Sequence, residues 1–380
     1  MPTRPLRHVV RALMSCLLVL TTMGLAAAAP TEAATTESRS WRVAPGVTYR
    51  QWHFTSRGGV PQRVHVLEVN PARRGVSLNY RTNAVLQQRA RTRQIVAAHR
   101  RAVAGTNASY FDISDTGAPD GIGRGRQRGL LHAPATGWNN AFYQAAGGGY
   151  HVGTLTFRGR IAQHPTWPVT GLNLPHARSN AITIYTPVWG DASGRAVVDR
   201  RRTPVREVHV RGGVVRQNTH TLRKGHRFRG SLLIGLGRGA RLLRTLGVGS
   251  RIGLSWGLDP KPRMAVTGSQ VLVRGGRVVA TSDHERAPRT AVGIDRSTGH
   301  VLLVALDGRE ERAKGMGVIR WARFLASLGI DDAVNLDGGG SSTMVARSAD
   351  GSRTGVVNRP SLGHQRRVPD ALTVDYAPRG

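Results

Sequence analysis

The segment best suited to chemistry is an acid followed by three glycines and two serines. The apolar run Val334–Leu336 leads into Asp337, then Gly338–Gly340, then Ser341 and Ser342. Because glycine has no side chain and tolerates positive φ, a ligand can approach this backbone closely. Successive exposed N–H groups form an anion-binding nest that suits phosphate. The alternative is a tight turn in which the acid caps the loop, but so long a polar and glycine-rich run favours a binding loop.

Other acids stand out because the chain has only 22 acidic residues. Asp112 follows the segment Asn107–Phe111, Asp120 lies between proline and glycine, and Asp307 ends an apolar run before Gly308-Arg309. An Asp-Gly pair after a strand is also an ordinary hairpin signal, so the turn interpretation of Asp307 stays open. An arginine before a strand, such as Arg289, can fork onto a phosphate, although a surface arginine is the simpler explanation in so basic a chain.

Metal binding is left open by the residue spacing. Asp337, Asn335 and Asp307 carry oxygen donors that suit Ca²⁺, but no spacing demands an ion, so the metal is unknown and no cofactor is certain. The chain has no Walker loop, no His-Glu-x-x-His motif and no Gly-x-Ser-x-Gly elbow.

Short apolar runs separated by Gly, Pro and Asn predict a strand-rich fold. A helix is expected near Thr92, and the clearest helix spans Gly317 to Leu328, with Gly329 as a left-handed terminator. We find no repeat and no composition break. The prediction is therefore an α+β fold, with a single strand-rich domain of mixed sheets and few helices.

The amino-terminal region has the layout of an export signal. Arginines at positions 4, 7 and 11 precede an apolar run from Ala12 to Ala29, and small residues offer cleavage sites. We predict a signal peptide over residues 1–34, a flexible exit segment over 35–40 and a folded domain over 41–377. No transmembrane span is expected after cleavage, and the protein is expected to be secreted or associated with the cell wall.

The mature chain would lack cysteine and carry a strong positive charge. Cys16 is the only cysteine, and the formal net charge is +33, with arginine as the dominant base. Such charge suits a polyanion, for example an anionic wall polymer, or is simply a solvated surface. Nucleic acid is the less favoured ligand because the arginines are spread along the chain without aromatic interleaving.

Four motifs in this order resemble the phosphodiester glycosidase family: residues 107–112, 288–293, 307–309 and 335–342. The similarity extends from about Trp41 to Tyr376 and includes residues 367–372. Ala108 and Ser109 stand where the family usually has two glycines. Bacterial members are often described as exopolysaccharide biosynthesis proteins.

The resemblance implies an exported hydrolase that cleaves sugar-1-phosphodiesters, such as N-acetylglucosamine-1-phosphodiester linkages in glycans or wall polymers, to a free sugar and a phosphomonoester. Its catalytic residues would be Asp337, Asp307 and Asp112. The alternative is a non-catalytic protein that binds anionic wall polymer or polysaccharide. The predicted substrate-binding residues are Asn107, Arg289, Thr290, Arg309, Asn335, Gly338, Gly339, Gly340, Ser341 and Ser342.

Overall fold

The computed structural model describes residues 36–56, 58–198, 204–281, 283 and 285–378. The predicted signal peptide, residues 1–34, lies outside them. The segment 35–40, expected to be a flexible exit, instead enters strand β1 (Thr36–Ala44) at Thr36. The reason is pairing: β1 runs antiparallel to β2 (Val47–Ser56), with Thr36 opposite His53.

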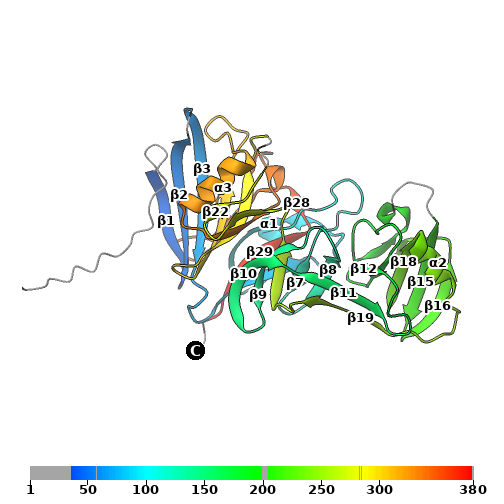
Figure 1. Ribbon diagram of the computed structural model, residues 1–380. Helices are drawn as coiled ribbons and strands as arrows, with labels where there is room; N and C mark the ends of the chain where they lie inside the picture. Colours follow the sequence, from blue (N-terminus) through cyan, green and yellow to red (C-terminus); the bar gives the residue numbers. More distant parts are fainter. Residues whose placement is uncertain (1–35, 57, 199–203, 282, 284, 379–380) are drawn as a thin grey trace, which may run out of the picture.

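An eight-stranded sheet forms one end of the elongated molecule and carries helix α3 on its face (Figure 1). Two of the three catalytic candidates lie at strand ends in this sheet, because Asp307 follows β24 and Asp337 follows β25. Its strands, in spatial order, are β1, β2, β3 (Val60–Val69), β24 (His300–Leu306), β23 (Arg289–Asp295), β25 (Asp332–Leu336), β21 (Val271–Arg274) and β22 (Arg277–Val278).

A ten-stranded sheet runs from the middle of the molecule to its far end, where β15, β16 and β18 lie beside α2 (Figure 1). Within the described residues, only the pair β12 and β13 is parallel. The strand order of the ten-stranded sheet is β10 (Gly148–Thr154), β9 (Asn140–Ala145), β20 (Met264–Thr267), β7 (Gly123–Gly125), β8 (Gly129–Pro134), β12 (Val169–Leu172), β13 (Ile182–Tyr185), β18 (Ser231–Leu236), β15 (Val205–Arg211) and β16 (Val214–Thr219).

A five-stranded sheet brings the two ends of the predicted domain together in the middle of the molecule. Its central strand β6 pairs with both β26 and β29, so residue Asn107 at the end of β6 lies beside the glycine loop that precedes β26. The order is β27 (Thr354–Val356), β26 (Met344–Arg347), β6 (Ala102–Asn107), β29 (Asp370–Tyr376) and β4 (Val76–Thr82).

The remaining strands form three two-stranded sheets. They are β11 (Thr156–Ile161) with β19 (Leu254–Asp259), β14 (Asp191–Ser193) with β17 (Lys224–Arg227), and β5 (Ala90–Arg91) with β28 (Arg367–Val368).

Helices are few and short in the described part of the chain. The α-helices are α1 (Thr92–Ala97), α2 (Arg238–Arg244) and α3 (Val318–Ser327), and the 3₁₀ turns are η1 (Gly194–Val197) and η2 (Gly339–Ser341). The expected helices α1 and α3 are confirmed, and Gly329 has the left-handed φ of +80° that the sequence predicted. Helix α2 was missed because its glycine-rich start read as a loop. No helix among these residues is long and apolar enough to cross a membrane.

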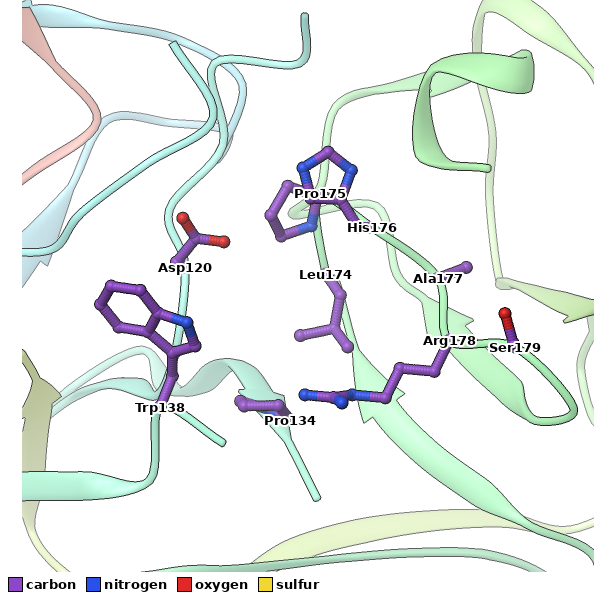
Figure 2. A pocket seen from close by; sticks show the side chains of 10 residues that line it. Asp120, Pro134, Trp138, Leu174, Pro175, His176, Ala177, Arg178 and Ser179 are labelled. Atoms are coloured by element: carbon purple, nitrogen blue, oxygen red, sulfur yellow. The ribbon is translucent and has the colours of Figure 1, made fainter. Parts of the chain in front are cut away.

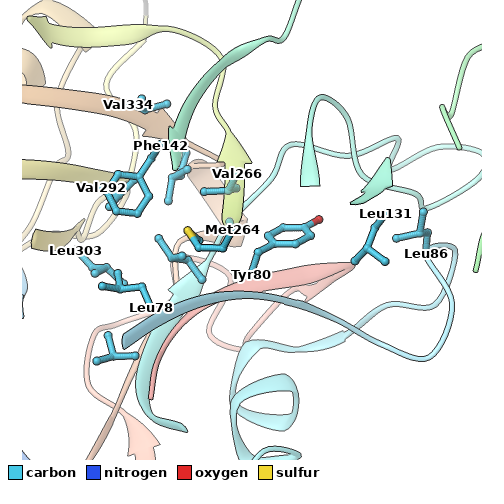
Figure 3. Close-up of a cluster of buried hydrophobic side chains, with 14 of the residues drawn as sticks. Leu78, Tyr80, Leu86, Leu131, Phe142, Met264, Val266, Val292, Leu303 and Val334 are labelled. Atoms are coloured by element: carbon cyan, nitrogen blue, oxygen red, sulfur yellow. The ribbon is translucent and has the colours of Figure 1, made fainter. Parts of the chain in front are cut away.

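Fold class needs a correction. The strand-rich prediction with mixed sheets and few helices is confirmed, but α+β overstates the helices, and the fold is mostly β. Its main core is filled by aliphatic and aromatic side chains from all three large sheets, among them Leu78, Phe142 and Val334 (Figure 3). Burial of this apolar surface is the dominant favourable term in folding, and the core supports the strand ends that carry the site.

Candidate active site

The glycine loop between β25 and β26 is held in place by buried polar side chains. The Asn107 amide donates to the Asp337 carbonyl at 2.6 Å, and its oxygen accepts from the Thr343 N–H at 3.0 Å. Thr290 donates to the same amide oxygen at 3.2 Å and to the Ser342 hydroxyl at 3.1 Å. These three predicted binding residues, Asn107, Thr290 and Ser342, are nearly inaccessible. They position the loop and are not free to contact a ligand.

Three of the N–H groups expected to form a phosphate-binding nest are already bonded within the protein. The N–H of Gly339 donates to the Pro288 carbonyl at 2.8 Å. The amides of Ser341 and Ser342 donate to the Gly338 and Gly339 carbonyls in the 3₁₀ turn. These three donors are thus used within the protein, two of them inside the turn, as is usual for short helical turns. Anion binding by the loop backbone stays a prediction that concerns the N–H groups of Gly338 and Gly340.

The three glycines of the loop differ in what a side chain would meet. A Cβ at Gly340 would lie 2.5 Å from Arg366 Nη2, and one at Gly339 would lie 3.6 Å from Arg309 Nη1. Gly338 is needed for a different reason, because its Cβ would lie 2.8 Å from the Pro288 carbonyl oxygen. Gly340 therefore gives the Arg366 guanidinium access to the backbone, whereas a side chain at Gly339 would make only ordinary contact with Arg309.

Three arginines gather around this loop. Arg366 donates to the Ser341 hydroxyl at 3.3 Å. Arg309, at a φ of +61°, pairs with the exposed Glu285 at 3.0 Å, and Arg289 donates to the Glu285 carbonyl at 2.7 Å. Guanidinium groups bind phosphate with matched planar geometry, so the cluster could hold an anionic phosphodiester. Sequence reasoning missed Arg366 because nothing distinguishes it from the many other arginines.

Asp337 precedes the three glycines, is only 9% exposed and feels the charge of Arg366. Burial raises its pKa to about 7, and the Ser341 hydroxyl and the Arg366 charge oppose that rise only in part. The charge of the buried Asp370 acts in the same direction as burial. A carboxyl with a pKa near 7 can donate or accept a proton at neutral pH, which suits a general acid or base.

Asp307 lies in a different setting. Its carboxylate accepts from Arg63 at 3.1 Å, from Asn358 at 3.2 Å and from the Arg359 N–H at 2.9 Å, and it contacts His65 Nε2 at 3.0 Å. Burial acts to raise its pKa, but the His65 bond and the other donors outweigh burial and lower it. Asn358 also donates to the Ser342 carbonyl at 3.1 Å, so Asp307 supports the glycine loop from behind.

The carboxylate of Asp112 binds the residues that directly follow it in the chain. Its carboxylate accepts from the N–H groups of Ser114, Asp115 and Thr116 and from the Thr116 hydroxyl, at 2.8 to 3.3 Å. Burial would raise its pKa, but these bonds lower it. An aspartate that binds the N–H groups following it stabilises a turn, so Asp112 shapes the loop of residues 112–116.

Asn335 and Tyr110 form the wall next to Asp337. The Asn335 amide donates to the Tyr110 hydroxyl at 2.8 Å and to Ser269 at 3.0 Å. Within the described residues the amide oxygen of Asn335 is buried without a hydrogen-bond partner. Burial, and then the Asp337 charge, raise the pKa of Tyr110. Tyr110 is a site residue that sequence reasoning did not select, although it lies within the motif 107–112.

A chain of buried polar groups links this wall to the loop of Asp120. Asp370 accepts from the Ser109 N–H at 2.8 Å and from the Tyr80 hydroxyl at 2.7 Å, and Tyr80 is also 2.7 Å from His132 Nε2. The other ring nitrogen of His132 is 2.8 Å from the Gly121 carbonyl. Figure 3 shows the Tyr80 hydroxyl among apolar side chains. Ser109 therefore takes part in this network through its backbone N–H.

An open cleft of about 540 Å³ lies beside the site and not at Asp337 itself. Asp120 and Trp138 form one wall, and residues 174–179 form the other (Figure 2). Trp138 packs against Tyr110 with ring centroids 5.2 Å apart, so the cleft joins the wall of the catalytic candidate. Trp138 is 38% exposed and has a φ of +52°, a conformation that is strained for a bulky side chain.

The described residues contain no cluster of side chains suited to bind a metal ion. Among the described residues, no group of three or more His, Cys, Asp or Glu side chains could hold an ion. Of the oxygen donors considered for Ca²⁺, Asp307 already accepts bonds from several donors. Its carboxylate is therefore not free to serve as a ligand.

Comparison with known proteins identifies the carboxyl-terminal half. Residues 191–375 match the family model described as phosphodiester glycosidase. A segment of 89 residues, 23% of the chain, is 35% identical to the uncharacterized prophage-derived protein YomE of Bacillus subtilis. A segment of 57 residues, 15% of the chain, is 46% identical to N-acetylglucosamine-1-phosphodiester alpha-N-acetylglucosaminidase of Bos taurus. The matched segments span only 13% and 10% of these relatives.

The overall fold has a solved counterpart. A putative exported protein from Burkholderia pseudomallei superimposes with a TM-score of 0.72 and 21% identity, over 93% of this chain and 98% of that one. At this identity the likeness concerns the fold alone. It shows that most of the chain, including residues before 191, has an architecture found in another protein.

Proposed function

The chain belongs, over residues 191–375, to the phosphodiester glycosidase family, and on that premise we propose that it hydrolyses sugar-1-phosphodiesters. In this reaction the bond between the anomeric carbon and the phosphate oxygen breaks. Water supplies a hydroxyl to the sugar and a proton to the remainder. The products are a free sugar and a phosphomonoester.

The observation that carries the proposal is the environment of Asp337. It is a buried carboxyl whose pKa is raised to about 7, and it lies beside Arg366 and the arginines around the glycine loop. Phosphate binding and proton exchange at neutral pH are the two functions that this hydrolysis needs. Donors placed where charge develops stabilise a transition state, and here negative charge moves onto the phosphate.

Each residue has a role that follows from its position. Arg366 and Arg309 would bind the phosphate oxygens, with Arg289 adding positive charge behind them. Asp337 would exchange the proton with the bridging oxygen or with water. Asn335 is buried and would hold Tyr110 in place beside the substrate through its amide group. Asp307 and Asp112 are left with supporting roles.

The substrate is proposed to lie outside the cytoplasm. The expected export signal, the high positive charge and the family together favour N-acetylglucosamine-1-phosphodiester-like linkages in exopolysaccharide, other glycans or wall polymers. A relative is named for this N-acetylglucosamine linkage, which makes it the first substrate to test.

The test is release of free sugar by the purified protein from the methyl phosphodiester of N-acetylglucosamine 1-phosphate. We expect Asp337→Asn to lower turnover by a factor on the order of 10²–10⁴, the contribution of a general acid or base. Asp259→Asn is the matched control, because Asp259 is exposed on β19 and should turn over like wild type. Salt-sensitive polymer binding without any sugar release would instead favour the non-catalytic binding protein.

A further inference from the structure

We propose that the cleft beside the active site is a saccharide subsite, in which Trp138 stacks on an uncharged pyranose ring and Asp120 accepts hydrogen bonds from its hydroxyls. This inference rests on the proposed function, because the pyranose would be part of the same substrate. The cleft reaches the catalytic candidate through Trp138, Tyr110 and Asn335, which contact one another in sequence.

Trp138 lines the cleft in a strained backbone conformation. It is 38% exposed with a left-handed φ of +52°, directly after Gly137 at +65°. The Arg178 guanidinium donates to the Thr136 carbonyl and so fixes this loop from the opposite wall. A strained and exposed aromatic residue held in this way is an observation from which function can be inferred. Tyr110 supports one side of the indole ring, and the indole lines the cleft (Figure 2).

Asp120 is an acceptor without a partner. Within the described residues nothing hydrogen-bonds to its carboxylate, although its backbone is fixed by the bond from its N–H to the Tyr110 carbonyl at 2.8 Å. The next residue, Gly121, is held by His132 at 2.8 Å. A Cβ at Gly121 would lie 1.9 Å from the Thr267 hydroxyl, so this close packing needs glycine. A fixed, half-buried carboxylate with free lone pairs is suited to bind hydroxyl donors.

The charge balance of the cleft favours a neutral ligand. The described lining, including its continuation past His176, carries two carboxylates, Asp115 and Asp120, and two guanidiniums, Arg178 and Arg195. The whole chain has 55 basic residues against 22 acidic ones, so this balance sets the cleft apart from the general surface. An aromatic wall with a few polar groups is typical of small-molecule sites of this volume.

The pyranose could be the sugar that is released or a sugar on the other side of the phosphate. Two substrates distinguish these sources. One diester carries methyl on the phosphate, and the other carries a hexose. If Trp138→Ala lowers kcat/KM about tenfold for the hexose diester alone, the cleft holds the leaving-group sugar. An equal loss with both diesters means that it holds the released sugar, and both results support the proposal.

Binding is measured separately so that the subsite can be tested even if no diester is hydrolysed. We expect methyl N-acetylglucosaminide or methyl glucoside to bind the wild type in calorimetric titrations, with affinity about tenfold lower in Trp138→Ala and in Asp120→Asn. Trp138→Phe should recover part of it, since an aromatic face remains. The control is Trp256→Ala, because Trp256 is similarly exposed, at 37%, but lies on β19 away from the cleft.

The proposal is overturned if neither neutral pyranoside binds the wild type, or if the Trp138 and Trp256 variants behave alike. It is also overturned if inorganic phosphate binds the cleft in a Trp138-dependent manner while the pyranosides do not. Failure of the proposed hydrolysis would look different. It would abolish sugar release from both diesters and leave the pyranoside titration unchanged.

Discussion

Asp307 and Asp337 follow β24 and β25, the two strands that flank β23 in one sheet, and both are buried, yet their pKa values shift in opposite directions. Asp307 accepts from Arg63, Asn358 and the Arg359 N–H and contacts His65, and its pKa is lowered. Asp337 has weaker compensation, mainly from Ser341 and Arg366, and its pKa rises to about 7. The number of donors, and not burial alone, separates a structural carboxylate from one able to exchange protons.

The largest effect is expected from a substitution at Asp307, which would remove the acceptor of this hydrogen-bond network. We expect Asp307→Asn to reduce the free energy of unfolding by about 3–5 kcal/mol, the usual cost of removing one partner of a buried ion pair. The new amide group would face the donors that now bind the carboxylate, and Arg63 would keep only Glu310 as an ionic partner. Urea unfolding measures the effect, with Asp259→Asn as the exposed control. A loss below about 1 kcal/mol would mean that the Asp307 network does not support the fold.

For Asp337→Asn we expect the free energy of unfolding, relative to that of the wild type, to increase as the pH rises. Because its folded pKa is raised above the unfolded value, the folded state holds the proton more tightly, and wild-type stability falls as pH rises from about 4 to about 7. The asparagine variant lacks this loss. Its stability relative to wild type should therefore increase by about 3 kcal/mol between pH 4 and pH 8. Urea unfolding at both pH values is the measurement, and a constant difference would contradict the assignment.

Sequence patterns predicted the strands and two helices well where apolar periodicity was clear. The segment from Val318 to Ser327 is helical, and its buried Trp321 and Leu325 lie on one face. The sequence pattern was less informative where a strand forms only because it pairs with another strand. Thr36–Ser40 is polar and looked flexible, but β2 supplies its hydrogen-bond partners.

For the site, the sequence identified the correct segments but not the task of each residue. Asn107 and Asp307 belong to recognisable motifs, yet whether their polar atoms face a ligand or the protein depends on partners more than 200 residues away. Arg366 gave no signal, since it is one arginine among many. Asp120 was conspicuous as an acid, but its free carboxylate became visible only with the cleft.

The central claim is that Asp337, and not Asp307, is the carboxyl that exchanges protons near neutral pH. Its most direct test is a carbon-13 NMR titration of protein labelled at the aspartate carboxyl carbons, with Asp337→Asn used to assign the signal. We predict that the signal missing from the variant titrates in the wild type with a midpoint near pH 7. A midpoint at or below the ordinary aspartate value of about 3.9 would contradict the account.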